Sequence, residues 1–263
     1  MKRQTLRKLV RPAKPLLAKT LWRVGTVRTI LLGPCRGLRY RIFPGMGLSP
    51  IYGGWEEDAQ NLMKKHIKPQ DVVYDIGANY GIHTLLFARL VGQPGHVYAF
   101  EPVPDIHAEL GVNVGLNNFH NVTTLKMAVS EHAGPAFFSR GHHVGAGHLA
   151  EAANEQDLLN VETATLDDFV FEKGNRPPNF MKLDIEGGEG SALRGAMRVL
   201  KEHRPIVLVD LHTPEQDLAV GRVFSEAHYE AFRTEDGEKV QDLSRGWPAP
   251  EGLWGQVIAF PKN

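Results

Sequence analysis

The stretch VVYDIGANYG, residues 72–81, joins an apolar run to a loop that contains two glycines. The first three residues have the composition of a strand that is covered on both faces. The run ends at Asp75, and the loop carries Gly77 and Gly81 before a helical pattern begins. A strand, a glycine-containing turn and a helix in this order predict a ligand site at the carboxyl end of the strand.

Further apolar runs of strand length alternate with helical patterns along the rest of the chain. This alternation predicts a doubly wound α/β fold with a mostly parallel sheet. An edge strand is expected at 38–42 and an amphipathic helix at 56–67. No clear strand is expected in the loop at 140–160. The other expected strands cover 96–101, 122–127, 180–184, 206–211, 229–234 and 256–260.

The length of 263 residues, with 42% hydrophobic and 23% charged residues, is typical of one substantial globular core. We expect an N-terminal extension over 1–36 and a single domain over 37–263. Cys35 is the sole cysteine, which excludes an intrachain disulfide and fits a reducing, cytoplasmic compartment. We expect its thiol to be structural.

The N-terminal region is strongly basic. Residues 1–55 contain 12 Lys/Arg and no Asp/Glu, which leaves 18 basic and 30 acidic residues in 56–263. Apolar residues recur at helical spacing over 16–31, which predicts a basic amphipathic helix. A solvated or self-docked extension is the preferred interpretation, and peripheral contact of 1–32 with an anionic membrane is the second. An organellar transit peptide has the same composition. The acidic body, without a recognisable reading module, argues against a nucleic-acid substrate.

The chemistry of the loop favours a cationic ligand. The glycines are four residues apart, unlike the G-x-G-x-x-G pattern that holds a pyrophosphate. Asp75 would repel a pyrophosphate, since like charges at about 4 Å cost roughly 1 to 4 kcal/mol. S-adenosylmethionine carries a sulfonium and an ammonium but no phosphate. Gly77 permits close backbone approach, Asn79 adopts positive φ easily, and Gly81 is expected where the helix begins near the ligand.

A second acid follows at the end of the next strand. Glu101 lies 20 residues after Gly81 and is placed to accept hydrogen bonds from both ribose hydroxyls. Asp75 and Glu101 together predict an adenosyl ligand, with S-adenosylmethionine as the cofactor. The alternative is structural: the glycines only form a tight turn, and Glu101 is a solvated strand end.

The chain resembles the FkbM family of S-adenosylmethionine-dependent methyltransferases from residue 71 to about 212, with a lead-in at 52–60. This resemblance implies the class I Rossmann-like fold with seven strands and methyl transfer to a hydroxyl, often on a sugar, glycan or polyketide. It also implies that the turn at 128–130, beginning with Ala128, borders the adenine. The matching pieces are YGGWEEDAQ, VVYDIGANYGIHTLLFARLVG, GHVYAFEP, AVSEHAG, VETATLDDF, NFMKLDIEGGEGSALRGA and RPIVLVDLH.

The candidate catalytic residues follow two later strands. Asp184 and Glu186 lie in KLDIEGGEG, and His212 follows IVLVDL. A hydroxyl acceptor loses its proton during attack, and a positioned carboxylate or imidazole can accept it. Asp184 and Glu186 are alternatives for this role or for orienting the acceptor, and His212 is the best-placed histidine. His83 is expected on a helix surface.

Metal dependence is not expected, because nothing in the residue spacing requires a bound ion. Carboxylates at Asp184, Glu186 and Asp210 would nevertheless suit Mg²⁺. His142, His143 and His148 lie in a glycine-rich loop that is interpreted as a mobile lid over the acceptor, with a solvated loop as the alternative. Zinc binding is less favoured, because no cysteine or firm ligand spacing supports it. Two other functions remain open: a nicotinamide-dependent oxidoreductase, which Glu101 fits, and a non-catalytic adenosyl-binding protein.

Overall fold

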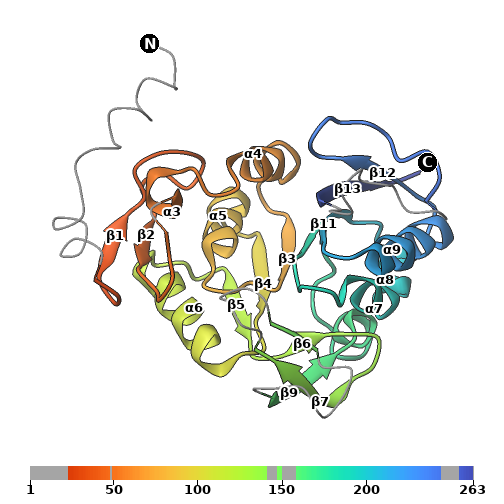
Figure 1. Cartoon of the computed structure of the whole chain (residues 1–263), viewed down its shortest axis with the longest axis horizontal. Helices are drawn as coiled ribbons and strands as arrows, with labels where there is room; N and C mark the ends of the chain where they lie inside the picture. Colours follow the sequence, from red (N-terminus) through yellow and green to blue (C-terminus); the bar gives the residue numbers. More distant parts are fainter. Residues whose placement is uncertain (1–22, 48, 141–146, 150–157, 244–254, 263) are drawn as a thin grey trace.

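A seven-stranded sheet forms the centre of the molecule (Figure 1). The computed structural model describes residues 23–47, 49–140, 147–149, 158–243 and 255–262. Within these residues the strand order is β12-β13-β11-β10-β3-β4-β5. The strands are β3 (Val72–Ile76), β4 (His96–Phe100), β5 (Val122–Leu125), β10 (Phe180–Leu183), β11 (Ile206–Leu211), β12 (Tyr229–Arg233) and β13 (Gly255–Pro261).

The strand pairing confirms the predicted fold class. The neighbouring strands from β5 through β4, β3 and β10 to β11 are all parallel, whereas β13 runs antiparallel to β11 and β12. The chain starts the sheet at β3, adds β4 and β5 on one side, and returns to place β10 on the other. The order therefore reverses between β3 and β10, which is where ligands bind in such sheets.

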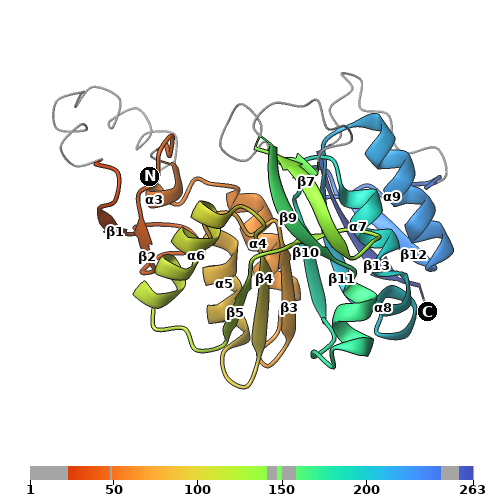
Figure 2. The ribbon, with the colours of Figure 1, turned by 90° about the horizontal axis from the view of Figure 1, so that it is seen from below.

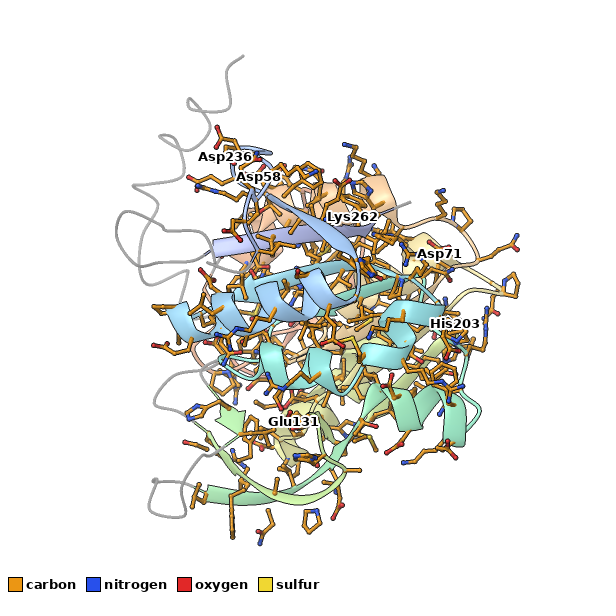
Figure 3. The ribbon with its side chains drawn as sticks, turned by 90° about the vertical axis from the view of Figure 1, so that its right-hand side faces the viewer. Asp58, Asp71, Glu131, His203, Asp236 and Lys262 are labelled. Carbon is orange, nitrogen blue, oxygen red and sulfur yellow. The ribbon has the colours of Figure 1, made fainter. Side chains whose placement is uncertain are left out.

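Helices cover both faces of the sheet, so strands such as β3 are buried along their whole length (Figure 2). This burial is the physical reason for their continuous apolar composition. Figure 3 shows the face covered by α7, α8 and α9. The first face carries α4 (Glu57–His66), α5 (Ile82–Val91) and α6 (Pro104–Leu116), and the second carries the π-helix η1 (Asp168–Glu172), α7 (Glu189–Arg194), α8 (Met197–Glu202) and α9 (Pro214–Glu226).

The described residues before β3 pack against the body. Strand β1 (Val27–Thr29) pairs antiparallel with β2 (Arg39–Arg41), and α3 (Ser49–Tyr52) follows. The helix predicted over 16–31 is therefore wrong at its described end, because the pairing with β2 and the burial of Ile30 override the helical pattern. Residues 1–22 lie outside the described part of the chain. Cys35 is buried and its thiol donates to Gln60, as expected of a structural cysteine.

A second, four-stranded sheet has the order β6-β9-β7-β8. Sequence reasoning missed this sheet because β6 and β8 have only two residues each, and β7 and β9 are partly exposed and lack a continuous apolar run. The histidine-rich loop lies largely outside the described residues, so its interpretation as a lid stays a prediction. Among the described residues, no helix has the length and apolar character needed to span a bilayer. The strands are β6 (Ala128–Val129), β7 (Gly134–Ser139), β8 (His148–Leu149) and β9 (Leu158–Ala164).

Candidate functional site

The loop after β3 is pressed against the end of β10. Gly77 has φ +82°, and a Cβ at this position would overlap the backbone carbonyl oxygen of Asp184. Asn79 has φ +51°, and its Oδ1 accepts a hydrogen bond from the Tyr80 amide at 2.9 Å. The predicted positive φ of Asn79 is thus confirmed. The backbone of the loop lies at the switch point because Gly77 has no side chain.

Gly81 begins α5 with φ +88°. A Cβ at this position would overlap the side chain of Leu110 in α6. Gly81 also lines the larger cavity described below, so the predicted nearness of the helix start to a ligand site is retained. The steric need for glycine, however, comes from packing between α5 and α6, which only the folded structure brings together.

Glu101 connects the end of β4 to the glycine loop. Its Oε2 accepts from the Asn79 amide at 3.0 Å, and its Oε1 accepts from the Val103 amide at 2.9 Å. Burial raises the pKa of Glu101 to about 7, although the two amide hydrogen bonds oppose the shift. Each carboxylate oxygen has a second lone pair. The predicted contact with ribose hydroxyls stays a prediction.

Asp75 lies beneath the loop and not at its mouth. Its side chain is 0% exposed, and its Oδ2 accepts from the Thr84 hydroxyl at 2.5 Å. The other oxygen has no hydrogen-bond partner among the described residues. Burial raises the pKa of Asp75, while the nearby Lys182 ammonium and Thr84 oppose this shift. Asp75 does not line the cavity above the loop, so its predicted contact with the cofactor stays a prediction.

A cavity of about 370 Å³ opens at the switch point. The glycine loop forms one wall, and the ends of β10 and β11 form the other. The segment before α4 completes the lining. The residues of the cavity are Tyr40, Phe43, Gly45, Met46, Gly47, Pro50, Trp55, Glu56, Gly77, Ala78, Asn79, Tyr80, Gly81, Ile82, His83, Lys182, Asp184, Glu186, Asp210 and His212.

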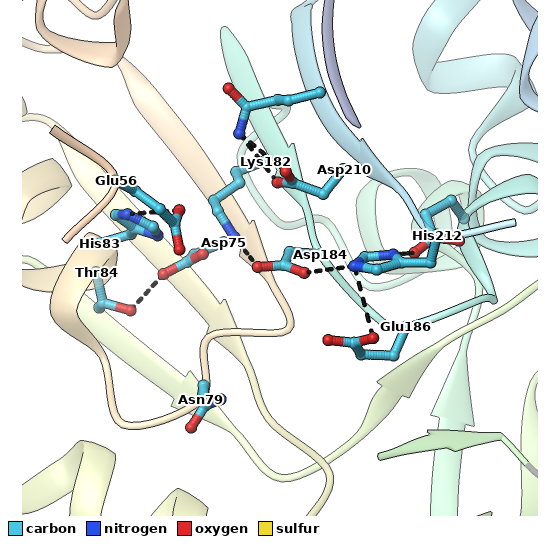
Figure 4. A network of polar contacts seen from close by, with 12 residues as sticks. Glu56, Asp75, Asn79, His83, Thr84, Lys182, Asp184, Glu186, Asp210 and His212 are labelled. Carbon is cyan, nitrogen blue, oxygen red and sulfur yellow. Dashed lines mark hydrogen bonds and ion pairs between the residues drawn. The ribbon is translucent and has the colours of Figure 1, made fainter. Parts of the chain in front are cut away.

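Lys182 provides a buried positive charge at this cavity (Figure 4). Its side chain is 2% exposed, and its Nζ lies 3.0 Å from Asp184 Oδ2. Burial would lower the pKa of Lys182, but Asp184, Asp210, Asp75 and Glu56 outweigh this effect and raise it. The same ammonium holds the pKa of Asp184 below its usual value despite burial. Sequence reasoning missed Lys182, although a lysine inside the apolar run FMKLD was a signal.

His212 is brought together with both predicted acids. Its Nε2 lies 3.6 Å from Asp184 Oδ1 and 3.6 Å from Glu186 Oε2. Its Nδ1 is 3.0 Å from Oε1 of the buried Glu189. Burial would lower the pKa of His212, but the hydrogen bond to Glu189 and the surrounding carboxylates raise it to about 9. His212 is therefore an imidazolium near neutral pH, which is poorly suited to accept a proton.

The same cluster has a spacing that a divalent cation could bridge. Asp184, Glu186 and His212 each offer a ligand atom, and these atoms all lie within 4.8 Å of one another. Carboxylate and imidazole donors suit several divalent metals. Even without a metal, the negative charges of Asp184 and Glu186 are balanced within the chain. Lys182 lies beside Asp184, and the His212 imidazolium lies beside both carboxylates.

A second, apolar cavity of about 30 Å³ shares Gly77 with the larger one. Ala128, which the family resemblance placed beside an adenine, lies in its wall. An acidic chamber and an apolar slot therefore meet at the glycine loop. The slot is lined by Ile76, Gly77, Phe100, Pro102, Met127, Ala128, Val129, Leu149, Ile185 and Gly188.

Two more residues of the cavity were not predicted as site residues. His83 is buried, and its Nε2 lies 3.5 Å from Glu56 Oε2, so the expectation of a helix-surface histidine is wrong. The reason is that residues of 40–47 and 50–56 line the same cavity as the first turn of α5. Glu56 lies outside the strand ends, and the one signal for it was its place in YGGWEEDAQ, the lead-in of the family resemblance.

Comparison with known proteins gives the family. Residues 75–239 match the family model described as the methyltransferase FkbM domain. The hexuronic acid methyltransferase AglP of Haloferax volcanii is 28% identical over 173 residues, which cover 65% of this chain and 69% of that protein. The 31-O-demethyl-FK506 methyltransferase FkbM of Streptomyces tacrolimicus is 29% identical over 159 residues, which cover 49% and 60%.

A third relative is the 2-O-methyltransferase NoeI of Sinorhizobium fredii, which is 25% identical over 153 residues. The match covers 52% of this chain and 62% of NoeI, so about a third or more of each of the three relatives lies outside the matched region. The family model itself extends over more than half of this chain, from the end of β3 to beyond β12. The chain belongs to the FkbM methyltransferase family.

Proposed function

We propose that this methyltransferase uses S-adenosylmethionine to methylate a hydroxyl of a sugar, glycan or polyketide-like acceptor. The observation that carries the proposal is the acidic cavity at the switch point of the sheet. Its wall contains four carboxylates and two cations, Lys182 and His212. The names of the relatives support the choice of acceptor, since they specify a hexuronic acid, the 31-O position of FK506 and a 2-O position.

The charge of the cavity favours a cationic cofactor over a dinucleotide. Glu56, Asp184, Glu186 and Asp210 leave an excess of negative charge after the two cations are counted. A diphosphate held at about 4 Å from an unpaired carboxylate would be repelled by roughly 1 to 4 kcal/mol. A sulfonium and an ammonium would instead be attracted. This argues against the nicotinamide-dependent alternative.

The chain's residues fit S-adenosylmethionine in two parts. The apolar slot beside Ala128 has the lining of an adenine site, but its volume of about 30 Å³ holds only about two water molecules, so the slot must widen to admit the ring. Glu101 lies outside both linings and would reach the ribose only after such a movement, while the amino-acid end would lie over the loop at 77–81. Gly77 lines both parts. When bound, the cofactor supplies a methyl group on a sulfonium, which leaves as a neutral thioether.

Orientation of the acceptor is the main contribution expected from Asp184, Glu186 and His212. In-line displacement requires the acceptor oxygen to approach along the axis of the breaking bond, and fixing this geometry provides much of the acceleration. Glu189 holds His212 through its Nδ1, and His212 in turn faces the two carboxylates. These carboxylates can accept hydrogen bonds from neighbouring hydroxyls of the acceptor.

Aromatic side chains in the cavity suit an acceptor with apolar faces. Trp55, Tyr40 and Phe43 belong to its lining, and Trp55 is 37% exposed. The C–H face of a sugar ring can pack on an aromatic ring, whose face carries partial negative charge. Ring stacking together with carboxylates that accept hydroxyl hydrogen bonds is a combination that recognises a polyol.

Titration of the whole chain with S-adenosylmethionine and with NAD tests the cofactor. We expect saturable binding of S-adenosylmethionine and at least about tenfold weaker binding of NAD, since about 1.4 kcal/mol of repulsion corresponds to a factor of ten. Calorimetry measures both. Binding of NAD without binding of S-adenosylmethionine would contradict the proposal. Binding of S-adenosylmethionine without methyl transfer to any hydroxyl acceptor would favour a non-catalytic adenosyl-binding protein.

Removal of divalent cations tests whether Asp184, Glu186 and His212 function without a bound metal. We expect methyl transfer to persist at an unchanged rate after dialysis against EDTA, because Lys182 and the His212 imidazolium already balance the carboxylates. The measurement is the rate of S-adenosylhomocysteine formation before and after chelation. Loss of activity that added Mg²⁺ or Mn²⁺ restores would show instead that Asp184, Glu186 and His212 bind a metal.

A further inference from the structure

The acceptor hydroxyl loses its proton during attack, and a general base in the cavity would accelerate this step. Most of the candidate groups there already have partners. Lys182 lies 3.0 Å from Asp184, while His212 lies 3.6 Å from both Asp184 and Glu186. The two oxygens of Asp210 accept from Gln256 Nε2 at 3.0 and 3.1 Å. Asp184 and Asp210 are therefore engaged with cationic or amide partners, and Glu186 faces the His212 imidazolium through Oε2.

Glu56 has a different environment on the opposite wall. Its side chain is 37% exposed, and its Oε2 lies 3.5 Å from Nε2 of the buried His83. Burial lowers the pKa of His83 to about 3, assisted by the Lys182 ammonium, so His83 is neutral and not a counter-ion. The Glu56 carboxylate thus faces the cavity, and the ionisable group beside it, His83, carries no charge.

The backbone at Glu56 holds this side chain in an uncommon conformation. Glu56 has φ 43° and ψ 42°, in the left-handed region, and precedes the first turn of α4. Its carboxylate does not cap the helix, so capping does not explain the conformation. The buried Gln60 fixes the backbone at residues 55–56. Its backbone N–H donates to the Glu56 carbonyl at 2.9 Å, and its side-chain Nε2 donates to the Trp55 carbonyl at 3.0 Å. Left-handed residues such as Glu56 are found at functional sites. Glu186 of the same cavity is also left-handed, with φ 57°, so the conformation marks both carboxylates and the neutral neighbour distinguishes Glu56.

We propose that Glu56 is the general base of the methyl transfer, an inference that rests on the proposed function. The acceptor O–H bond breaks, and its proton passes to the Glu56 carboxylate. The oxygen forms a bond to the methyl carbon, and the electron pair of the breaking C–S bond stays on sulfur. The products are the methyl ether, a neutral thioether and the protonated Glu56.

The electrostatic surroundings of Glu56 are consistent with this role. Partial burial of this side chain, which is 37% exposed, raises its pKa to about 7, and Asp184 and Asp210 add to the shift. Lys182 from β10 and the Trp55 indole oppose it. His83 from α5 is another titratable neighbour and stays neutral. A general base is most effective when its pKa is near the working pH. Because the carboxylate is the active form, activity should rise with pH and level off above about pH 7.

The test compares Glu56→Gln with the matched control Glu57→Gln, the next residue, which does not belong to the cavity lining. Methyl β-D-glucuronide serves as the acceptor probe, and kcat is measured between about pH 5.5 and about pH 9. We expect Glu56→Gln to lower kcat by roughly 10²- to 10⁴-fold and to remove the rise in activity with pH. The affinity for S-adenosylmethionine should stay within about twofold of wild type. Glu57→Gln should behave as wild type.

The outcomes separate this inference from the proposed function. Wild-type protein that fails to bind S-adenosylmethionine contradicts the proposed function. A Glu56→Gln variant that keeps kcat within about threefold and retains the pH dependence overturns the role of Glu56 alone. Carbon-13 NMR of protein labelled at its glutamate carboxyls measures the pKa of Glu56 without any acceptor. The signal of Glu56 is assigned as the one that is missing from the Glu56→Gln variant. Titration near pH 7 supports the inference, and titration below about pH 5 overturns it.

Discussion

Replacing Lys182 with alanine is expected to lower the free energy of unfolding by about 3 to 5 kcal/mol, the usual cost of leaving a buried charge without its partner. Lys182 faces Asp184, Asp210, Asp75 and Glu56, and its Nζ lies 3.0 Å from Asp184. Without the ammonium, carboxylates packed at the switch point would repel one another in a poorly solvated site. Urea unfolding of the two proteins measures the difference.

The pH dependence of this loss distinguishes charge from packing. In the variant, the carboxylates would have folded pKa values above their unfolded ones, so their destabilising effect grows as pH rises and shrinks as they are protonated. We therefore expect a smaller deficit at about pH 5 than at about pH 8. Lys182→Met keeps most of the side-chain volume and should show the same trend. A deficit that is equal at both pH values, or is absent from Lys182→Met, would assign the effect to packing alone.

Replacing Gly77 with alanine should weaken the binding of S-adenosylmethionine by at least about 100-fold, because the loop can accept a Cβ only by moving away from β10. Gly77 has φ +82°, and the added Cβ would overlap the carbonyl oxygen of Asp184. A left-handed non-glycine residue alone costs about 1 to 3 kcal/mol, and the overlap adds to this. Since Gly77 borders both cavities, the displacement would reach the adenine slot and the acidic chamber together. Calorimetric titration measures the affinity.

Gly111→Ala provides the matched control. Gly111 lies in α6, and a Cβ there would meet no atom within 4 Å. Alanine in a helix interior is favoured over glycine by about 0.5 to 1 kcal/mol, so this variant should be slightly more stable and bind the cofactor normally. If Gly77→Ala bound S-adenosylmethionine as tightly as Gly111→Ala, the loop would not need its close approach to β10.

The order of secondary structure and the edge of the sheet that holds the site could be derived from local sequence. Apolar runs such as VVYD and IVLVDL required burial on both faces, and this requirement produces a parallel sheet covered by helices. The parallel arrangement then places Asp184, Glu186 and His212 at one edge, where the structure shows them in contact. The left-handed conformation of Asn79 also follows from local chemistry, because asparagine tolerates it.

Other features depend on contacts between segments that are distant in sequence. Asp75 reads as an acid at a loop mouth, but Thr84 and Lys182 hold it beneath the loop. The end of the predicted N-terminal helix is a strand because β2 pairs with it. Glu56 reaches the cavity only because the segment before α4 folds over α5. The sequence by itself determined the layered fold and the edge where the strands end, since periodicity and burial act locally. Only the tertiary structure decided which charges face one another there, because burial and pairing of a charge depend on the whole packed chain.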